Sequence, residues 1–84
     1  MYSVYIVKCI DNSLYTGIAV NVEKRVNQHN NGKGAKYTKF RSPVKLVYTE
    51  SNFSDRSSAS KREYEIKHMT REQKLSLIAL NSSL

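Results

Sequence analysis

The polar side chains best placed for chemistry interrupt the apolar stripes of two expected helices. In a helix over residues 22–30, Arg25 and His29 share the inward stripe with two valines, because stripe positions recur at i, i+3, i+4 and i+7. In a helix over residues 57–68, Glu63 lies between apolar neighbours on a similar stripe. Burying an unpaired charge is costly, so we expect Arg25, His29 and Glu63 to form one shared site against a sheet. The alternatives are a structural Arg25–Glu63 ion pair or side chains that extend outward to solvent.

Two tyrosines lie on the two arms of an expected β-hairpin. Residues 2–10 and 14–19 are rich in β-branched and aromatic types, and Asp11-Asn12-Ser13 between them is typical of a turn. A two-residue loop places Tyr5 and Tyr15 on opposite faces of the sheet, whereas a three-residue loop places them on the same face. A single site with both tyrosines therefore requires the second register or a bulge that restores it. Ordinary strand packing of either tyrosine is the alternative.

The elements that must position these side chains follow the order β-β-α-β-α-α. Asn21 is a suitable N-cap for the first helix, and residues 31–43 form a Gly- and Lys-rich loop. Residues 44–50 are the expected third strand. Thr70-x-x-Gln73 matches a capping box and predicts a last helix that ends near residue 80. The predicted fold class is α+β, with a three-stranded antiparallel sheet and helices packed on it.

The remaining apolar residues are assigned to the core. Cys9 is expected to be a buried strand residue. The last helix carries four large apolar residues that are expected to complete the core rather than to bind another protein: Leu75, Leu77, Ile78 and Leu80.

Positive charge is concentrated in one part of the chain. The 84 residues carry a net charge of +7, and between Asn21 and Lys45 seven basic residues face only one acidic residue, Glu23. Such a concentration attracts polyanions, because neutralised phosphates release condensed counterions. Aromatic residues interleave with the cations, which suits phosphate contacts combined with base stacking on Tyr37 or Phe40. The candidate nucleic-acid-binding residues are Lys24, Lys33, Lys36, Tyr37, Lys39 and Arg41. A solvated basic face that keeps the protein soluble is the alternative.

The composition excludes several classes of protein. No run of about 18 apolar residues exists, and the N-terminus does not have the pattern of a signal peptide. The lone Cys9 has no partner for an internal disulfide, so a reducing cytoplasm is the expected location. The length suits one domain over residues 1–84.

At this point the chain resembles the GIY-YIG nuclease superfamily. The first signature is present as Ser3-Val4-Tyr5 and the second as Leu14-Tyr15-Thr16-Gly17. The segment from Glu23 to His29 is similar to the first helix of that family, and the segment from Arg62 to Lys67 is similar to its metal-binding helix. The resemblance covers nearly the whole chain. Gly34-Ala35-Lys36-Tyr37-Thr38 is typical of the short standalone bacterial members, often called YhbQ-type.

The resemblance implies a role for each candidate catalytic residue. Glu63 would hold one divalent cation, Mg²⁺ or Mn²⁺, with waters at most other positions. Tyr15 would be the general base for the attacking water, with His29 as its rival. Tyr5 would help to position that water or the phosphate. Arg25 would bind the scissile phosphate and stabilise charge in the transition state.

Three positions depart from the pattern of the family. Ser3 stands where the first signature has a glycine, and Thr16 stands where the second signature usually has an aliphatic residue. Ile18 stands where some members carry a lysine just after the second signature, which leaves His29 as an alternative base. Gly17 is retained and would let the backbone pass close to the site.

The resemblance implies a metal-dependent endonuclease that hydrolyses phosphodiester bonds in nucleic acid, in the first place DNA. Structure-directed cleavage of the repair or recombination type belongs to this expectation. The partner is nucleic acid and not a membrane. A bare domain is expected to cut weakly unless a protein partner supplies specificity. The alternative is a non-catalytic nucleic-acid-binding module on the same fold.

Overall fold

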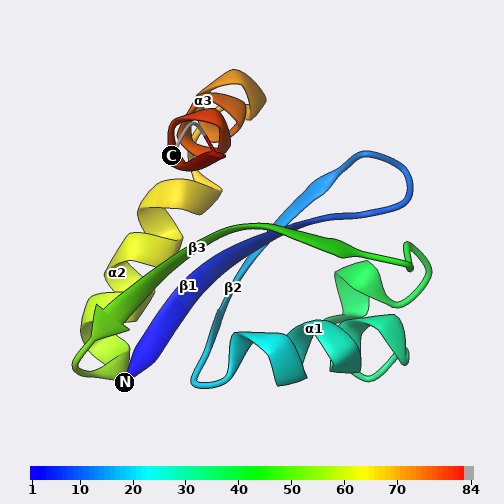
Figure 1. Cartoon of the computed structure of the whole chain (residues 1–84), viewed down its shortest axis with the longest axis horizontal. Helices are drawn as coiled ribbons and strands as arrows, with labels where there is room; N and C mark the ends of the chain where they lie inside the picture. The colour runs from blue at the N-terminus through cyan, green and yellow to red at the C-terminus, as the bar shows by residue number, and fades with distance from the viewer. Residues whose placement is uncertain (83–84) are drawn as a thin grey trace.

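The computed structural model describes residues 1–82 (Figure 1). Within them lie the elements β1 (Tyr2–Lys8), β2 (Leu14–Ala19), α1 (Val22–Asn30), the 3₁₀ turn η1 (Lys36–Thr38), β3 (Lys45–Phe53), α2 (Arg56–Lys67) and α3 (Arg71–Ser82). The predicted order β-β-α-β-α-α and the α+β class are confirmed. Two details differ from the prediction, because η1 interrupts the expected loop and β3 continues past residue 50. No helix in the described part of the chain is long and apolar enough to cross a bilayer.

The sheet has the strand order β2-β1-β3, and β1 pairs antiparallel with both neighbours. Tyr5 is opposite Gly17, and Val7 is opposite Tyr15. The connection between the two strands spans residues 9–13, where the N–H of Cys9 donates to the Ser13 carbonyl at 2.8 Å, and neither predicted register is observed. The pairing still places Tyr5 and Tyr15 on one face, because side chains two residues apart in a strand point the same way. The shared face needed for a single site is therefore present in a third register.

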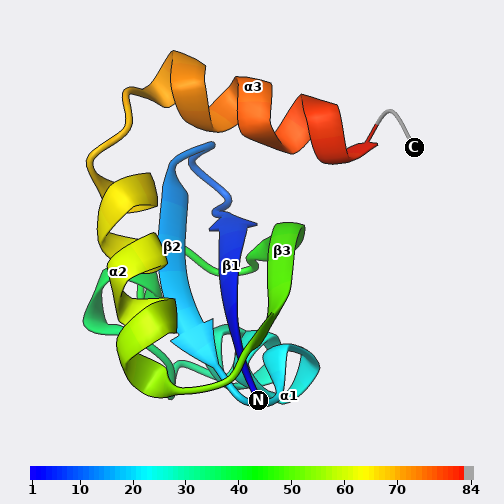
Figure 2. The ribbon, with the colours of Figure 1, turned by 90° about the vertical axis from the view of Figure 1, so that its left-hand side faces the viewer.

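The face of the sheet that carries the tyrosines is covered by α1. Tyr5, Val7, Cys9 and Val44 are buried there, and Val22 and Val26 of α1 are among the partly buried residues that pack against them. The predicted burial of Cys9 is confirmed. Figures 1 and 2 show α1 and α2 on opposite sides of the sheet. This face is where the candidate catalytic tyrosines meet the polar stripe of α1.

The opposite face is covered by α2 and α3 around Val4, Ile6 and Ile66. Thr16 of β2 is also buried, and its hydroxyl has no hydrogen-bond partner among residues 1–82. Arg62 holds α2 against β3, since its guanidinium donates three hydrogen bonds of 2.8 to 3.1 Å to the carboxylate of Glu50. Burial acts to raise the pKa of Glu50, but the hydrogen bonds from Arg62 and Tyr48 outweigh it and lower that pKa. Arg62 therefore fixes α2 to β3, and the neighbouring Glu63 takes no part in this pairing.

Local capping sets the helix boundaries. Asn21 accepts from the backbone N–H of Lys24 at 3.0 Å, as predicted. The predicted capping box is confirmed in both directions, with 2.8 Å from Thr70 N to Gln73 Oε1 and 3.1 Å from Gln73 N to Thr70 Oγ1. Asp55 caps α2 through the N–H of Ser58 at 2.7 Å. These caps fix where α2 and α3 begin, and with them the place of Glu63 and of the first turn of α3.

The apolar residues of α3 divide between the core and the surface. Leu77 and Ile78 pack against the core, as predicted. Leu75 and Leu80 are exposed, so their assignment to the core is wrong. The reason is geometric, since α3 contacts the rest of the fold mainly along β3 and buries only one side of the helix.

Candidate active site

A buried hydrogen bond between a tyrosine and a histidine lies at the centre of the α1 face. The Tyr5 hydroxyl is 2.8 Å from Nε2 of His29, and both side chains are almost completely buried. Gly17 is required opposite Tyr5, because a Cβ there would lie 2.5 Å from the tyrosine hydroxyl. The glycine of the second signature therefore serves the packing of the first tyrosine, consistent with its expected role.

The second ring nitrogen of His29 contacts the Gly- and Lys-rich loop of residues 31–43, which we call the basic loop. Nδ1 lies 2.7 Å from Oγ1 of Thr38 and accepts from the backbone N–H of Ala35 at 3.3 Å. A Cβ on Gly34 would collide with the imidazole ring, so only glycine fits beside it. The Thr38 hydroxyl also donates to the Ala35 carbonyl at 3.0 Å. The imidazole therefore links β1, through the Tyr5 hydroxyl, to the loop, through Thr38 and Ala35.

Tyr15 lies beside this pair and joins it to the basic loop through ring contacts. Its ring centre is 5.4 Å from that of His29 in an edge-on arrangement, and 5.8 Å from that of Tyr37 in a stacked one. Its hydroxyl makes no hydrogen bond to any residue in the range 1–82, so it is available to a ligand. The ring of Tyr15 is therefore fixed by two aromatic contacts, whereas its hydroxyl has no hydrogen-bond partner within residues 1–82.

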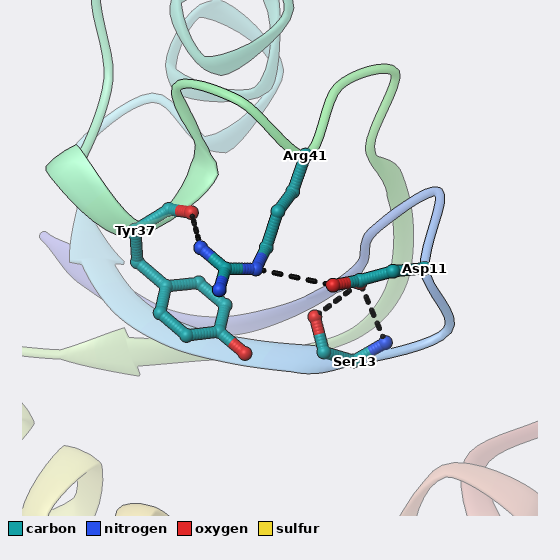
Figure 3. Close-up of polar contacts among 4 residues, drawn as sticks. All are labelled: Asp11, Ser13, Tyr37 and Arg41. Atoms are coloured by element: carbon teal, nitrogen blue, oxygen red, sulfur yellow. Dashed lines mark hydrogen bonds and ion pairs between the residues drawn. The ribbon is translucent and has the colours of Figure 1, made fainter.

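The Tyr37 ring is itself held by Arg41 (Figure 3). The Arg41 guanidinium lies 4.1 Å from the ring centre and donates to the Tyr37 carbonyl at 2.7 Å. Its Nε donates to Asp11 at 3.1 Å, and Asp11 in turn accepts from the backbone N–H of Ser13 at 3.0 Å. Tyr37 therefore already has partners in the free protein, and Phe40, which is 86% exposed, is the aromatic residue available to a base.

Arg25 borders the same site from α1. Its guanidinium donates to Gln28 at 3.1 Å, and it interacts electrostatically with both Tyr5 and His29. Burial raises the pKa of Tyr5, and the hydrogen bonding and the charge of Arg25 oppose that rise. Burial lowers the pKa of His29, and the charge of Arg25 lowers it further. The Tyr5–His29 pair is therefore neutral, while Arg25 supplies a fixed positive charge beside it.

Glu63 reaches the site from α2, which packs beside the edge strand β2. It pairs with Lys67 at 3.7 Å, and the Lys67 ammonium lies 5.9 Å from the ring centre of Tyr15, so Glu63 approaches the tyrosines from this side. The alternative of an Arg25–Glu63 ion pair is not observed within residues 1–82. Arg25 and His29 lie on the α1 side and Glu63 at the β2 edge, so the shared site opens at that edge rather than under one helix.

Residues 1–82 hold no group of three or more His, Cys, Asp or Glu residues able to cage a metal ion. A single carboxylate still fits Mg²⁺ or Mn²⁺, because Mg²⁺ commonly keeps several waters and uses substrate phosphates as ligands. The Glu63 side chain is 23% exposed and has only a long ion pair to Lys67 to give up. Glu63 is therefore the residue that would hold a cation here.

The candidate nucleic-acid-binding residues lie at the surface beside the site. Lys24 is on α1, Lys36 and Tyr37 are in η1, and the others lie in the loop on both sides of η1. All of the lysines and Tyr37 are exposed, whereas Arg41 is half-buried by its contacts with Asp11 and Tyr37. Because His29 fixes η1, these cations are held close to the Tyr5–His29 pair.

Two contributors were missed by the sequence reasoning. Lys67 places its ammonium 5.9 Å from the Tyr15 ring centre, on the same side as Glu63. Thr38 anchors η1 to His29. The signal for Lys67 was its i, i+4 spacing from Glu63. Nothing in the sequence marked Thr38, because its partner lies on another element.

Several known proteins are similar to this chain in sequence, and a solved structure is similar to it in fold. Residues 1–76 match the family described as the GIY-YIG catalytic domain. A UPF0213 protein of Staphylococcus saprophyticus is 62% identical over 76 residues, which are 90% of this chain and 92% of that protein. A UPF0213 protein of Clostridium perfringens is 58% identical over 82 residues, 98% of this chain and 87% of that protein. The solution NMR structure of a UPF0213 protein from Bacillus halodurans is 44% identical and covers 95% of this chain and 85% of its own, with a TM-score of 0.60.

Proposed function

Since this chain belongs to the GIY-YIG catalytic domain family, we propose that it is a phosphodiester hydrolase that cuts nucleic acid, in the first place DNA. The observation that carries the proposal is the convergence of candidate residues from three segments. Tyr5 and Tyr15 of the hairpin meet His29 of α1, and the charges of Arg25 and Glu63 both act on Tyr5. A scissile phosphate at this point would meet the guanidinium of Arg25, the hydroxyl of Tyr15 and the carboxylate of Glu63.

Arg25 is proposed to bind the scissile phosphate. Its guanidinium has five donors, and within residues 1–82 it has no carboxylate partner, so most of its charge is available to a phosphate. Charge that builds up on the phosphate oxygens during hydrolysis is stabilised by a donor fixed beforehand. Tyr5 is proposed to help position the same phosphate or the attacking water, since its hydroxyl is held by His29 and interacts with Arg25.

Tyr15 is proposed as the general base. His29 is a poor rival in this arrangement, because it is fully buried and both ring nitrogens already have partners. The Tyr15 hydroxyl makes no hydrogen bond within residues 1–82, and its ring lies beside Lys67, the partner of Glu63. His29 is instead proposed as a positioning residue that holds Tyr5 and η1.

Glu63 is proposed to hold a divalent cation, Mg²⁺ or Mn²⁺. When bound, such an ion polarises the phosphate and stabilises the leaving oxygen. The contribution of the protein is to keep one carboxylate at the β2 edge, with α2 fixed by the neighbouring Arg62–Glu50 contacts.

The test compares cleavage by the wild-type chain, Glu63→Gln and Glu65→Gln. Glu65 is a matched control, because it lies on the same helix and its exposed side chain is outside the site. The panel is single-stranded, duplex, flap and branched DNA plus RNA, with Mg²⁺, Mn²⁺ or EDTA. We expect cation-dependent cleavage that falls by about a hundredfold or more in Glu63→Gln, the scale seen when one transition-state donor is removed, and that persists in Glu65→Gln.

Two results would contradict the proposal. Equal cleavage by Glu63→Gln and the wild type would remove Glu63 from the mechanism. Salt-sensitive binding without cleavage of any substrate by the wild type would instead establish a non-catalytic nucleic-acid-binding module.

A further inference from the structure

We propose that a basic pocket at the hairpin end of β2 binds a backbone phosphate of the strand that is cut, and that this strand lies single-stranded along β2. The inference rests on the proposed function. The pocket has a volume of about 240 Å³ and is lined by Ser13, Leu14, Tyr37, Arg71 and Lys74. Figure 2 shows the reason for its position, since α3 crosses over the hairpin end of β2 and brings its first turn there.

The charge of this pocket suits a phosphate. Arg71 and Lys74 have no carboxylate partner within residues 1–82, where the ion pairs are Arg41–Asp11, Arg62–Glu50 and Lys67–Glu63. The carboxylate beside Ser13 is Asp11, which is already held by Arg41 and by Ser13 itself. Two uncompensated cations thus face a space that contains no free carboxylate, and such a site attracts a polyanion.

The pocket is directly connected to the candidate active site. Tyr37 forms one wall of the pocket and stacks with Tyr15 at a ring-centre distance of 5.8 Å. A strand with its scissile phosphate beside Tyr15 would therefore place a nearby phosphate of the same strand in the pocket.

A second basic pocket lies at the other end of β2. It has a volume of about 600 Å³, and its cations are Lys24, Arg25 and Arg56. The six residues of β2 separate the two pockets by roughly 17 Å, at about 3.4 Å per residue. The candidate catalytic residues lie between the two ends.

The size of the first pocket favours a single strand over a duplex. A space of about 240 Å³ bounded by Tyr37 and the first turn of α3 accommodates a phosphate and part of its sugar. A duplex presents a second strand beside the first, and a space of this size holds part of one strand only. The expected ligand is a flexible single strand that follows β2.

Binding of labelled oligonucleotides of increasing length tests this inference. The variant is Arg71→Ala/Lys74→Ala, made in the Glu63→Gln background so that cleavage does not interfere. The control in the same background is Lys45→Ala/Lys61→Ala, which removes the same charge from β3 and from the outer side of α2, outside both β2 pockets. Circular dichroism confirms that each variant is folded. Single-stranded DNA, single-stranded RNA and duplex DNA are compared over a range of salt concentrations.

We expect the slope of log affinity against log salt to become smaller by about 0.7 in the pocket variant, since it loses one single-strand phosphate contact and each accounts for about 0.7. The control slope should change much less. Affinity of the parent should rise with length until the strand spans both pockets, and that of the pocket variant should level off earlier.

Equal slopes in the pocket variant and the control would overturn the pocket, and an equal loss of duplex binding would overturn the single-strand assignment. Since no step of this assay requires cleavage, its failure is distinct from failure of the proposed hydrolysis.

Discussion

The Tyr5 hydroxyl is hydrogen-bonded to His29, so replacing Tyr5 should cost stability, whereas replacing Tyr15 should not. Tyr5 is 1% exposed, and its hydroxyl lies 2.8 Å from Nε2 of His29, which is fully buried. Tyr5→Phe keeps the ring but leaves Nε2 buried without a partner, which costs about 1–3 kcal/mol. In a domain of this size each kcal/mol lowers Tm by roughly 4–8 °C. Tyr15→Phe removes a hydroxyl with no hydrogen bond within residues 1–82, so its stability should stay within about 0.5 kcal/mol of the wild type.

The assay is urea unfolding followed by circular dichroism, together with cleavage by each folded variant. Tyr15→Phe should be stable but lose cleavage, whereas Tyr5→Phe should lose stability first. A double-mutant cycle of Tyr5→Phe with Thr38→Val should give a coupling energy above about 0.5 kcal/mol, because both groups bind the His29 ring. If Tyr5→Phe were no less stable than Tyr15→Phe, or if the coupling were zero, the His29 ring would not be held as described.

Two further predictions concern buried polar groups. Burial and the charge of Arg25 lower the pKa of His29, so the unfolded chain binds a proton near pH 6.5 that the fold excludes. Stability should therefore fall as pH drops below about 6.5 and level off below the folded pKa, and urea unfolding of His29→Gln should lack this slope. Thr16→Val should raise the unfolding free energy by about 1 kcal/mol, because it replaces a buried hydroxyl that has no partner within residues 1–82. A less stable valine variant would reveal a partner for that hydroxyl.

Local signals explain what the sequence predicted well. The caps at Asn21 and at Thr70 with Gln73 need only neighbouring residues, so their geometry follows from the pattern. The polar stripe of α1 gave the right face for His29 because helical periodicity is also local. Family membership followed from short signatures that remain recognisable without a structure.

Tertiary placement explains what the sequence did not predict. The hairpin register depends on how residues 9–13 close, with Asn12 in the left-handed region at φ 68°, and neither predicted loop length describes it. Lys67 and the cations of α3 reach the tyrosines only because α2 and α3 pack around the β2 end of the sheet. Their separation from Tyr15 along the chain concealed this proximity. The charge count therefore pointed only to residues 21–45, although Arg71 and Lys74 of α3 also line a basic pocket.

The attachment of η1 to His29 has a consequence for dynamics. A loop that crosses the surface normally opens independently of the core. Here its turn is fastened to a ring that also binds the central strand, so the loop and the α1 face should open together as one cooperative unit. The loop amides near Thr38 should then exchange with deuterium at rates close to those of α1. Much of the entropic cost of ordering these cations is met during folding, and an arriving phosphate chain encounters a surface that is already arranged.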